Sequence, residues 1–169
     1  MTAAEQQQQA TDGQSSRPPT VLLVRAKKPS PILTESGFSV VSPYVEQFWQ
    51  SALGPTSTAL IRHLARHRLH IGDESAQYTP VDLALTRIAL GIGRRGMEGR
   101  SGPLFKSVDR LARFGFLTID QTRAGTPSHV TISTHVVTVP VGIQREWPDE
   151  LVQRHDAFLR QVLGDHGDR

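Results

Sequence analysis

Apolar residues recur at three- and four-residue spacings along five separate segments of the chain, which is the period of an amphipathic helix. In the segment that begins at Pro103, Leu104, Val108 and Leu111 fall on one side and leave the charged residues on the other. The pattern predicts helices over residues 43–53, 55–67, 79–90, 103–114 and 148–163.

Helix-start and helix-stop residues stand at the ends of these segments. Ser42-Pro43 and Thr79-Pro80 each place a capping hydroxyl before a proline at the first helical position. Gly54 and Gly115 follow the last apolar residue of their segments, which is where glycine ends helices. These signals support the predicted boundaries.

A β-hairpin is predicted downstream of the fourth helix. Phe116 to Ile119 and Val130 to Ile132 alternate apolar and polar residues, as half-buried strands do. Residues 123–127 (Arg-Ala-Gly-Thr-Pro) have turn composition. We expect the hairpin over about residues 116–133 and a short strand at Phe38–Val41, and Val21–Val24 could form another short strand.

The chain is long enough for one domain with tails. Residues 1–19 combine a glutamine run with serines and prolines, a composition that buries too little apolar surface to offset the entropy of ordering. We therefore predict a disordered tail over residues 1–36, one domain over 37–163 that includes the helix at 148–163, and a disordered end over 164–169.

Composition limits the cellular location and the kinds of chemistry that we expect. The longest aliphatic run is Val21–Val24 and no basic segment precedes an apolar one at the N-terminus, so we expect no membrane span, no secretion and a cytoplasmic location. The chain has no cysteine, which excludes disulfides, thiolate metal sites and cysteine nucleophiles.

Charge is distributed unevenly along the chain. The net charge is only +3, but residues 94–123 hold seven basic and three acidic residues, a local balance of +4. From Pro140 onward four arginines face six acids. A positive middle beside a mildly negative end favours a polyanionic partner.

Two other sequence patterns give weaker evidence for a ligand site. Residues 91–96 (Gly-Ile-Gly-Arg-Arg-Gly) match the dinucleotide-binding pattern, but a predicted helix precedes them where that motif needs a strand. His63, His67 and His70 have metal-like spacing without an acid or cysteine near in sequence, so a basic surface is the better account. No nucleophile elbow, HExxH or P-loop occurs, and we expect no metal, no cofactor and no enzymatic activity.

Helix, loop, helix and hairpin follow one another from about Pro55 to Val139. Residues 108–117 (VDRLARFGFL) carry the fourth predicted helix through a glycine directly into the first hairpin strand. In these features the chain resembles the winged helix-turn-helix superfamily of DNA-binding proteins. The resemblance implies a mainly α fold with a small β-hairpin wing, of the α+β class, with flanking N- and C-terminal helices. One departure is the glycine-rich loop before the fourth helix, which is longer than the tight turn of the simplest members.

The resemblance also implies double-stranded DNA as the partner. The helix over about 103–114 would enter the major groove, and its outward N-terminal half nominates Lys106, Ser107 and Arg110 for base edges, Arg110 as a bidentate guanine contact. We expect phosphate contacts from Arg94, Arg95, Arg100 and Arg113, and contacts near the wing tip from Arg123, Ser128 and His129.

The leading hypothesis is a DNA-binding transcriptional regulator. One alternative is an adaptor whose winged helix binds protein, since a fold does not fix its function. Another is a DNA-binding replication or partition factor of a plasmid or mobile element. The helix at 148–163 would either form a homodimer contact or fold back on its own domain.

Overall fold

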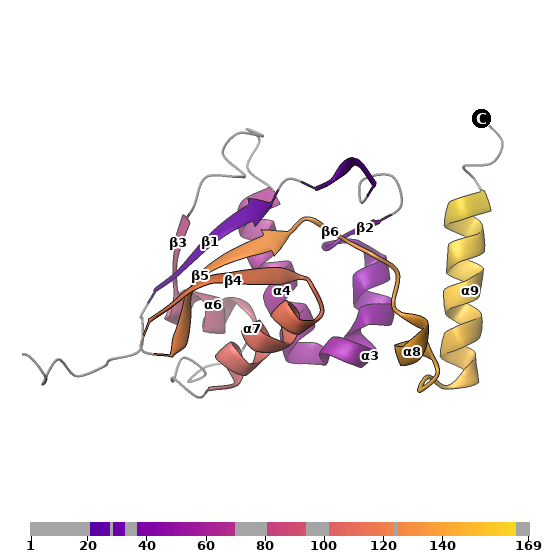
Figure 1. Cartoon of the computed structure of the whole chain (residues 1–169). Helices are drawn as coiled ribbons and strands as arrows, with labels where there is room; N and C mark the ends of the chain where they lie inside the picture. The colour runs from indigo at the N-terminus through magenta and orange to yellow at the C-terminus, as the bar shows by residue number, and fades with distance from the viewer. Residues whose placement is uncertain are drawn as a thin grey trace, which may run out of the picture.

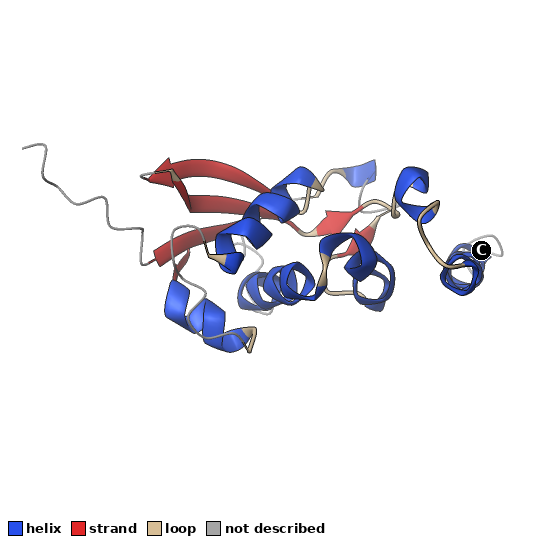
Figure 2. Ribbon diagram, turned by 90° about the horizontal axis from the view of Figure 1, so that it is seen from below, coloured by secondary structure: helices blue, strands red, loops and turns tan. Residues whose placement is uncertain are grey.

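A four-stranded sheet with helices on one face is the main feature of the structure (Figure 1 and Figure 2). The computed structural model describes residues 21–27, 29–32, 37–69, 81–93, 102–123 and 125–164. Within this part of the chain the sheet order is β3-β1-β5-β4, and a two-stranded sheet pairs β2 with β6.

The elements follow one another as strands and helices mixed along the chain. They are β1 (Val21–Lys27), β2 (Phe38–Ser39), a π-helical segment η1 (Val45–Trp49) that continues into α3 (Gln50–Leu53), α4 (Pro55–Leu69), β3 (Val81–Ala84), α6 (Leu85–Gly91), α7 (Pro103–Arg113), β4 (Leu117–Arg123), β5 (Thr126–Ser133), β6 (His135–Val136), α8 (Val141–Gln144) and α9 (Asp149–Gly164). The expected α+β class is therefore confirmed in its coarse form.

Strand β1 lies in the middle of the sheet. It pairs antiparallel with β3, with Leu22 opposite Leu83, and parallel with β5, with Val24 opposite Val130. Its side chains alternate, so that Leu22 and Val24 are fully buried while Arg25 and Lys27 are exposed. One face of the sheet thus packs on the helices and the other carries polar residues.

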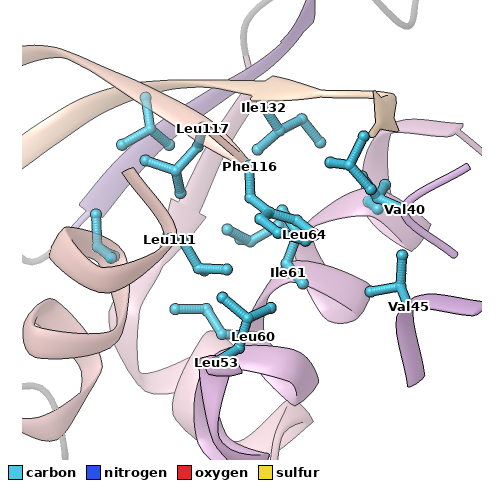
Figure 3. Close-up of a cluster of buried hydrophobic side chains, with 14 of the residues drawn as sticks. Val40, Val45, Leu53, Leu60, Ile61, Leu64, Leu111, Phe116, Leu117 and Ile132 are labelled. Carbon is cyan, nitrogen blue, oxygen red and sulfur yellow. The ribbon is translucent and has the colours of Figure 1, made fainter. Parts of the chain in front are cut away.

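The core lies between the inner face of the sheet and helices α4 and α7. Figure 3 shows side chains from the strands and the helices meeting in one cluster. Its fully buried members include Leu60, Ile61 and Leu64 of α4, Leu104, Val108 and Leu111 of α7, and Val130 and Ile132 of β5. The two helices are amphipathic as predicted, and their apolar faces account for their places against the sheet.

The domain boundary predicted at residue 37 is wrong. Residues 21–27, placed in the tail, form the central strand β1. From the sequence, at most a short strand could be predicted at Val21–Val24. The strands that pair with this segment lie far along the chain, so the local pattern does not reveal them. Residues 1–20 and 165–169 fall outside the described residues.

The third helix begins later than predicted. Val81–Ala84 is strand β3, and α6 covers only Leu85–Gly91. The capping pair Thr79-Pro80 lies outside the described residues. Four residues predicted as helix are extended because the edge of β1 supplies them with backbone hydrogen bonds, and tertiary pairing overrides local propensity.

The hairpin is present but is not a separate wing. Strands β4 and β5 pair antiparallel with an irregular register around Gln121, and Gly125 has φ 72 at the turn. Because β5 also pairs with β1, the hairpin is the edge of a four-stranded sheet rather than the small appendage expected in a mainly α fold.

An aromatic cluster packs α9 against the same chain. The Tyr44 hydroxyl lies 2.9 Å from Nε2 of His155 and accepts a 2.9 Å hydrogen bond from the Val139 amide. Phe158 contacts the rings of Tyr44 and Phe48. His155 is 2% exposed and belongs to this cluster. One face of α9 therefore folds back on its own domain, and the dimer contact predicted for this helix stays a prediction.

The contact between α4 and α6 generates a stability prediction. A Cβ at Gly91 would stand 2.0 Å from Cε1 of His63. We expect Gly91→Ala to destabilise the protein by about 1–2 kcal/mol through overpacking. In a His63→Ala background the same change is expected to be neutral or to stabilise by about 0.5 kcal/mol, because alanine favours helix. Urea unfolding of the four variants measures this, and an equal effect in both backgrounds contradicts it.

The buried Tyr44 hydroxyl generates a pH prediction. Burial raises the pKa of Tyr44 from 10.0 to about 12, against the opposing effect of the Val139 hydrogen bond. Because folding favours the neutral form of Tyr44, the stability that this group contributes to the folded state is intact below pH 10. That stability declines as the pH rises from 10 towards 12. Between pH 8 and pH 11 the wild type should lose about 1.4 kcal/mol more unfolding free energy than Tyr44→Phe. Equal losses in urea unfolding at the two pH values would refute this account.

Candidate nucleic-acid interface

Helix α7 presents one apolar and one cationic face. Gly102 precedes it in extended conformation and Pro103 occupies its first turn. At its end, the Phe116 amide bonds the Leu111 carbonyl at 2.9 Å, the Gly115 amide bonds the Ala112 carbonyl at 3.1 Å, and Gly115 has φ 76. This is a Schellman ending, and it directs the chain straight into β4.

Three basic side chains lie on the exposed face of α7. Lys106, Arg110 and Arg113 are exposed, at spacings that place them along one side of the helix. None of them forms an ion pair with an acidic side chain of the described residues. Asp109 is also exposed, three residues after Lys106 and four before Arg113, so it neighbours both and offsets part of their charge. The structure thus brings together three of the predicted site residues in one cationic row.

One nitrogen of the Arg110 guanidinium is hydrogen bonded within the protein. Its Nη1 donates a 3.2 Å hydrogen bond to the carbonyl of Leu53, the last residue of α3. A Cβ at Gly54 would stand 3.3 Å from the same nitrogen, so glycine lets the guanidinium approach the backbone closely. The bond fixes the side chain across the α3–α4 corner and leaves its Nε–Nη2 edge without a partner among the described residues.

Ser107 is not on the outward face. It is only 6% exposed and lies on the flank of α7 that turns towards α4. The prediction that Ser107 lies on the outward face of the helix is therefore wrong. Leu104, Ser107, Val108 and Leu111 have the spacing of a single buried stripe, and a serine inside that stripe belongs to it despite its polarity.

A hollow of about 250 Å³ lies between the α3–α4 corner and the N-terminal half of α7. Sequence reasoning missed this feature. Its lining residues are Leu53, Gly54, Pro55, Thr56, Ser57, Pro103, Lys106, Ser107 and Arg110. One sequence signal would have found it: Gly54-Pro55 starts a long helix without any capping side chain, which leaves amides of the first turn unpaired.

The predicted hairpin contacts do not extend the cationic row of α7. His129 alternates with the inward Val130, so it belongs to the outer face of the sheet, and its Nδ1 lies 3.0 Å from the Ser128 hydroxyl. Ser128 is 8% exposed and donates to the Gln121 carbonyl, so it is not an open wing-tip contact. Arg123 is exposed at the end of β4.

The outer sheet face contains a polar network that neutralises one acid of the basic segment. Arg25 Nε donates to Thr131 Oγ1 at 2.7 Å, and that hydroxyl donates to Asp120 Oδ2 at 2.5 Å. Arg25 Nη2 lies 3.5 Å from the same carboxylate oxygen. Arg25 therefore largely neutralises the charge of Asp120, and this carboxylate reduces the positive potential near α7 only slightly.

The exposed side of α4 is less cationic than the sequence suggested. Burial lowers the pKa of His63 from 6.5, and the nearby His67 and Arg66 lower it further. The rings of His63 and His67 lie 4.5 Å apart, edge to face. The described residues gather no group of three His, Cys, Asp or Glu side chains suited to a metal ion, and His70 lies outside them.

Three of the predicted phosphate contacts fall outside the described part of the chain. These are Arg94, Arg95 and Arg100, within residues 94–101. In the part that is described, no helix combines the length and apolar character needed to cross a membrane.

Comparison of the chain with protein-family models, with curated proteins and with solved structures finds no match.

Proposed function

We propose that this protein binds double-stranded DNA through the exposed face of α7, with the β4–β5 hairpin beside it, and acts in the cytoplasm as a transcriptional regulator. The observation that carries the proposal is the row of Lys106, Arg110 and Arg113, exposed and without acidic partners among the described residues. Cations on the exposed face of a helix are suited to phosphates and groove edges.

The order of elements supports the same interpretation. Helix α4, strand β3, helices α6 and α7 and hairpin β4–β5 follow one another as the elements of winged helix domains do. The departure is β1, which lies between β3 and β5. In this interpretation α7 corresponds to the recognition helix and the hairpin to the wing.

The polar character of α7 favours DNA over a protein partner. A surface that binds another protein usually presents apolar or aromatic side chains at its centre. The large apolar residues of α7 (Leu104, Phe105, Val108 and Leu111) are all buried, and the exposed positions are charged apart from Pro103. The adaptor alternative therefore has less support on this face.

A salt-dependent binding experiment tests the proposal. We expect a random duplex of about 20 base pairs to bind in fluorescence anisotropy with an affinity that falls steeply as salt rises. Lys106→Ala/Arg113→Ala should reduce the slope of log K against log salt by about 1.8, or about 0.9 for each phosphate that is no longer neutralised. Arg110 is left intact here because its hydrogen bond to Leu53 also holds the α3–α4 corner.

A control of equal charge makes the result specific. Arg145→Ala/Arg154→Ala removes two exposed arginines from the C-terminal region and should leave the slope unchanged. An equal reduction in this control would show that only net charge matters. Absence of binding by the wild type even at low salt would refute DNA binding.

A further inference from the structure

The hollow beside α7 borders the N-terminus of α4, whose first backbone amides have no intrahelical hydrogen-bond partner. Helix α4 begins at Pro55, and Gly54, whose carbonyl accepts from the Thr58 amide at 3.1 Å, has no side chain to cap the first turn. The amides of Thr56 and Ser57 precede the first residue with an intrahelical acceptor. Both residues line the hollow. The positive end of the α4 dipole therefore points at this space.

Two serine side chains that are more than nine-tenths buried give a second and independent indication of a ligand. Ser57 is 3% exposed and Ser107 is 6% exposed, and both line the hollow from opposite helices. Neither hydroxyl makes a hydrogen bond to a protein atom of the described residues, and neither oxygen is among the unpaired atoms that are sealed from solvent. Both hydroxyls therefore open onto the hollow, where they can donate to a group that enters it.

The charge of the hollow specifies the kind of group. Lys106 and Arg110 line it and no acidic residue does. The Arg110 guanidinium is held over Gly54 by its 3.2 Å bond to Leu53. Amide protons, hydroxyls and two cations around one small space are the donors that a tetrahedral oxyanion accepts from.

We propose that this hollow is a binding site for a phosphate group, held by the Thr56 and Ser57 amides, the hydroxyls of Ser57 and Ser107, and the charges of Lys106 and Arg110. On DNA the group is one backbone phosphodiester. This second step rests on the proposed function: Lys106 and Arg110 belong both to the hollow and to the exposed row of α7, so a duplex lying on that row passes over the hollow.

Inorganic phosphate tests the site without DNA. In amide-resolved NMR of the full chain, phosphate should shift the Thr56 and Ser57 resonances with a saturable, millimolar dependence, while chloride at equal ionic strength should not. Thr56→Asp places a carboxylate in the first turn, where the helix dipole favours it, so the fold is kept while a bound anion is repelled. This variant should lose the saturable shift, and the neutral Thr56→Asn should keep it.

Arg154→Ala is the matched control, because it also lowers the net charge by one and lies on the exposed side of α9. It should bind phosphate as the wild type does. If phosphate moves neither amide at about 50 mM, where a site of millimolar affinity would be filled, the site is refuted, whatever the DNA measurements show.

DNA titrations of the same variants separate the two sources of phosphate. If Thr56→Asp abolishes binding of one phosphodiester, it should lower the salt slope by about 0.9 and the affinity at 0.1 M salt by about eightfold, with Arg154→Ala unchanged. If the wild type binds inorganic phosphate but Thr56→Asp leaves the salt slope of DNA binding unchanged, the site does not hold a DNA phosphodiester. The site is then assigned to a free phosphate ligand. Phosphate binding without any DNA binding supports the site and refutes the proposed function.

Discussion

The pairing of β1 with strands on both sides is the constraint on which the rest of the structure depends. This strand joins β3, which precedes α6, to β5, which follows α7, so segments from three parts of the chain form one sheet. Arg25 and Thr131, hydrogen bonded across the β1–β5 pair, are 106 positions apart in sequence. Pairing on both edges satisfies the backbone groups of β1, so the strand can lie at the centre with Leu22 and Val24 fully buried under the helices.

This sheet determines which sides of the helices remain free. Its inner face takes the apolar stripes of α4 and α7, and the Schellman ending at Gly115 ties the end of α7 to the start of β4. The cationic row of α7 is then directed away from the core. The same packing brings the N-terminus of α4 against the flank of α7, where the hollow forms between Ser57 and Ser107. The proposed DNA-binding face and the proposed phosphate site are thus two consequences of one packing arrangement.

Asp109 offsets part of the positive charge on the exposed face of α7, and two other acidic side chains are engaged elsewhere. Asp120 is engaged by Arg25 and Thr131 on the opposite face of the sheet, and Glu46 pairs with Arg62 at 2.6 Å. The acids of α9 belong to a helix whose buried side contacts Tyr44 and Phe48. With three exposed cations against Asp109, the face of α7 keeps a net positive charge that a polyanion would meet.

The sequence by itself determined the helices α4, α7 and α9, the hairpin and the exposure of Lys106, Arg110 and Arg113, because helical periodicity and glycine stops act over a few residues. Only the tertiary structure decided that residues 21–27 form a central strand, that Val81–Ala84 is extended, that Ser107 faces α4 and that Arg110 bonds the carbonyl of Leu53. These features depend on partners distant in the chain, and a local pattern contains no information about which distant backbone or side chain will supply the missing contact.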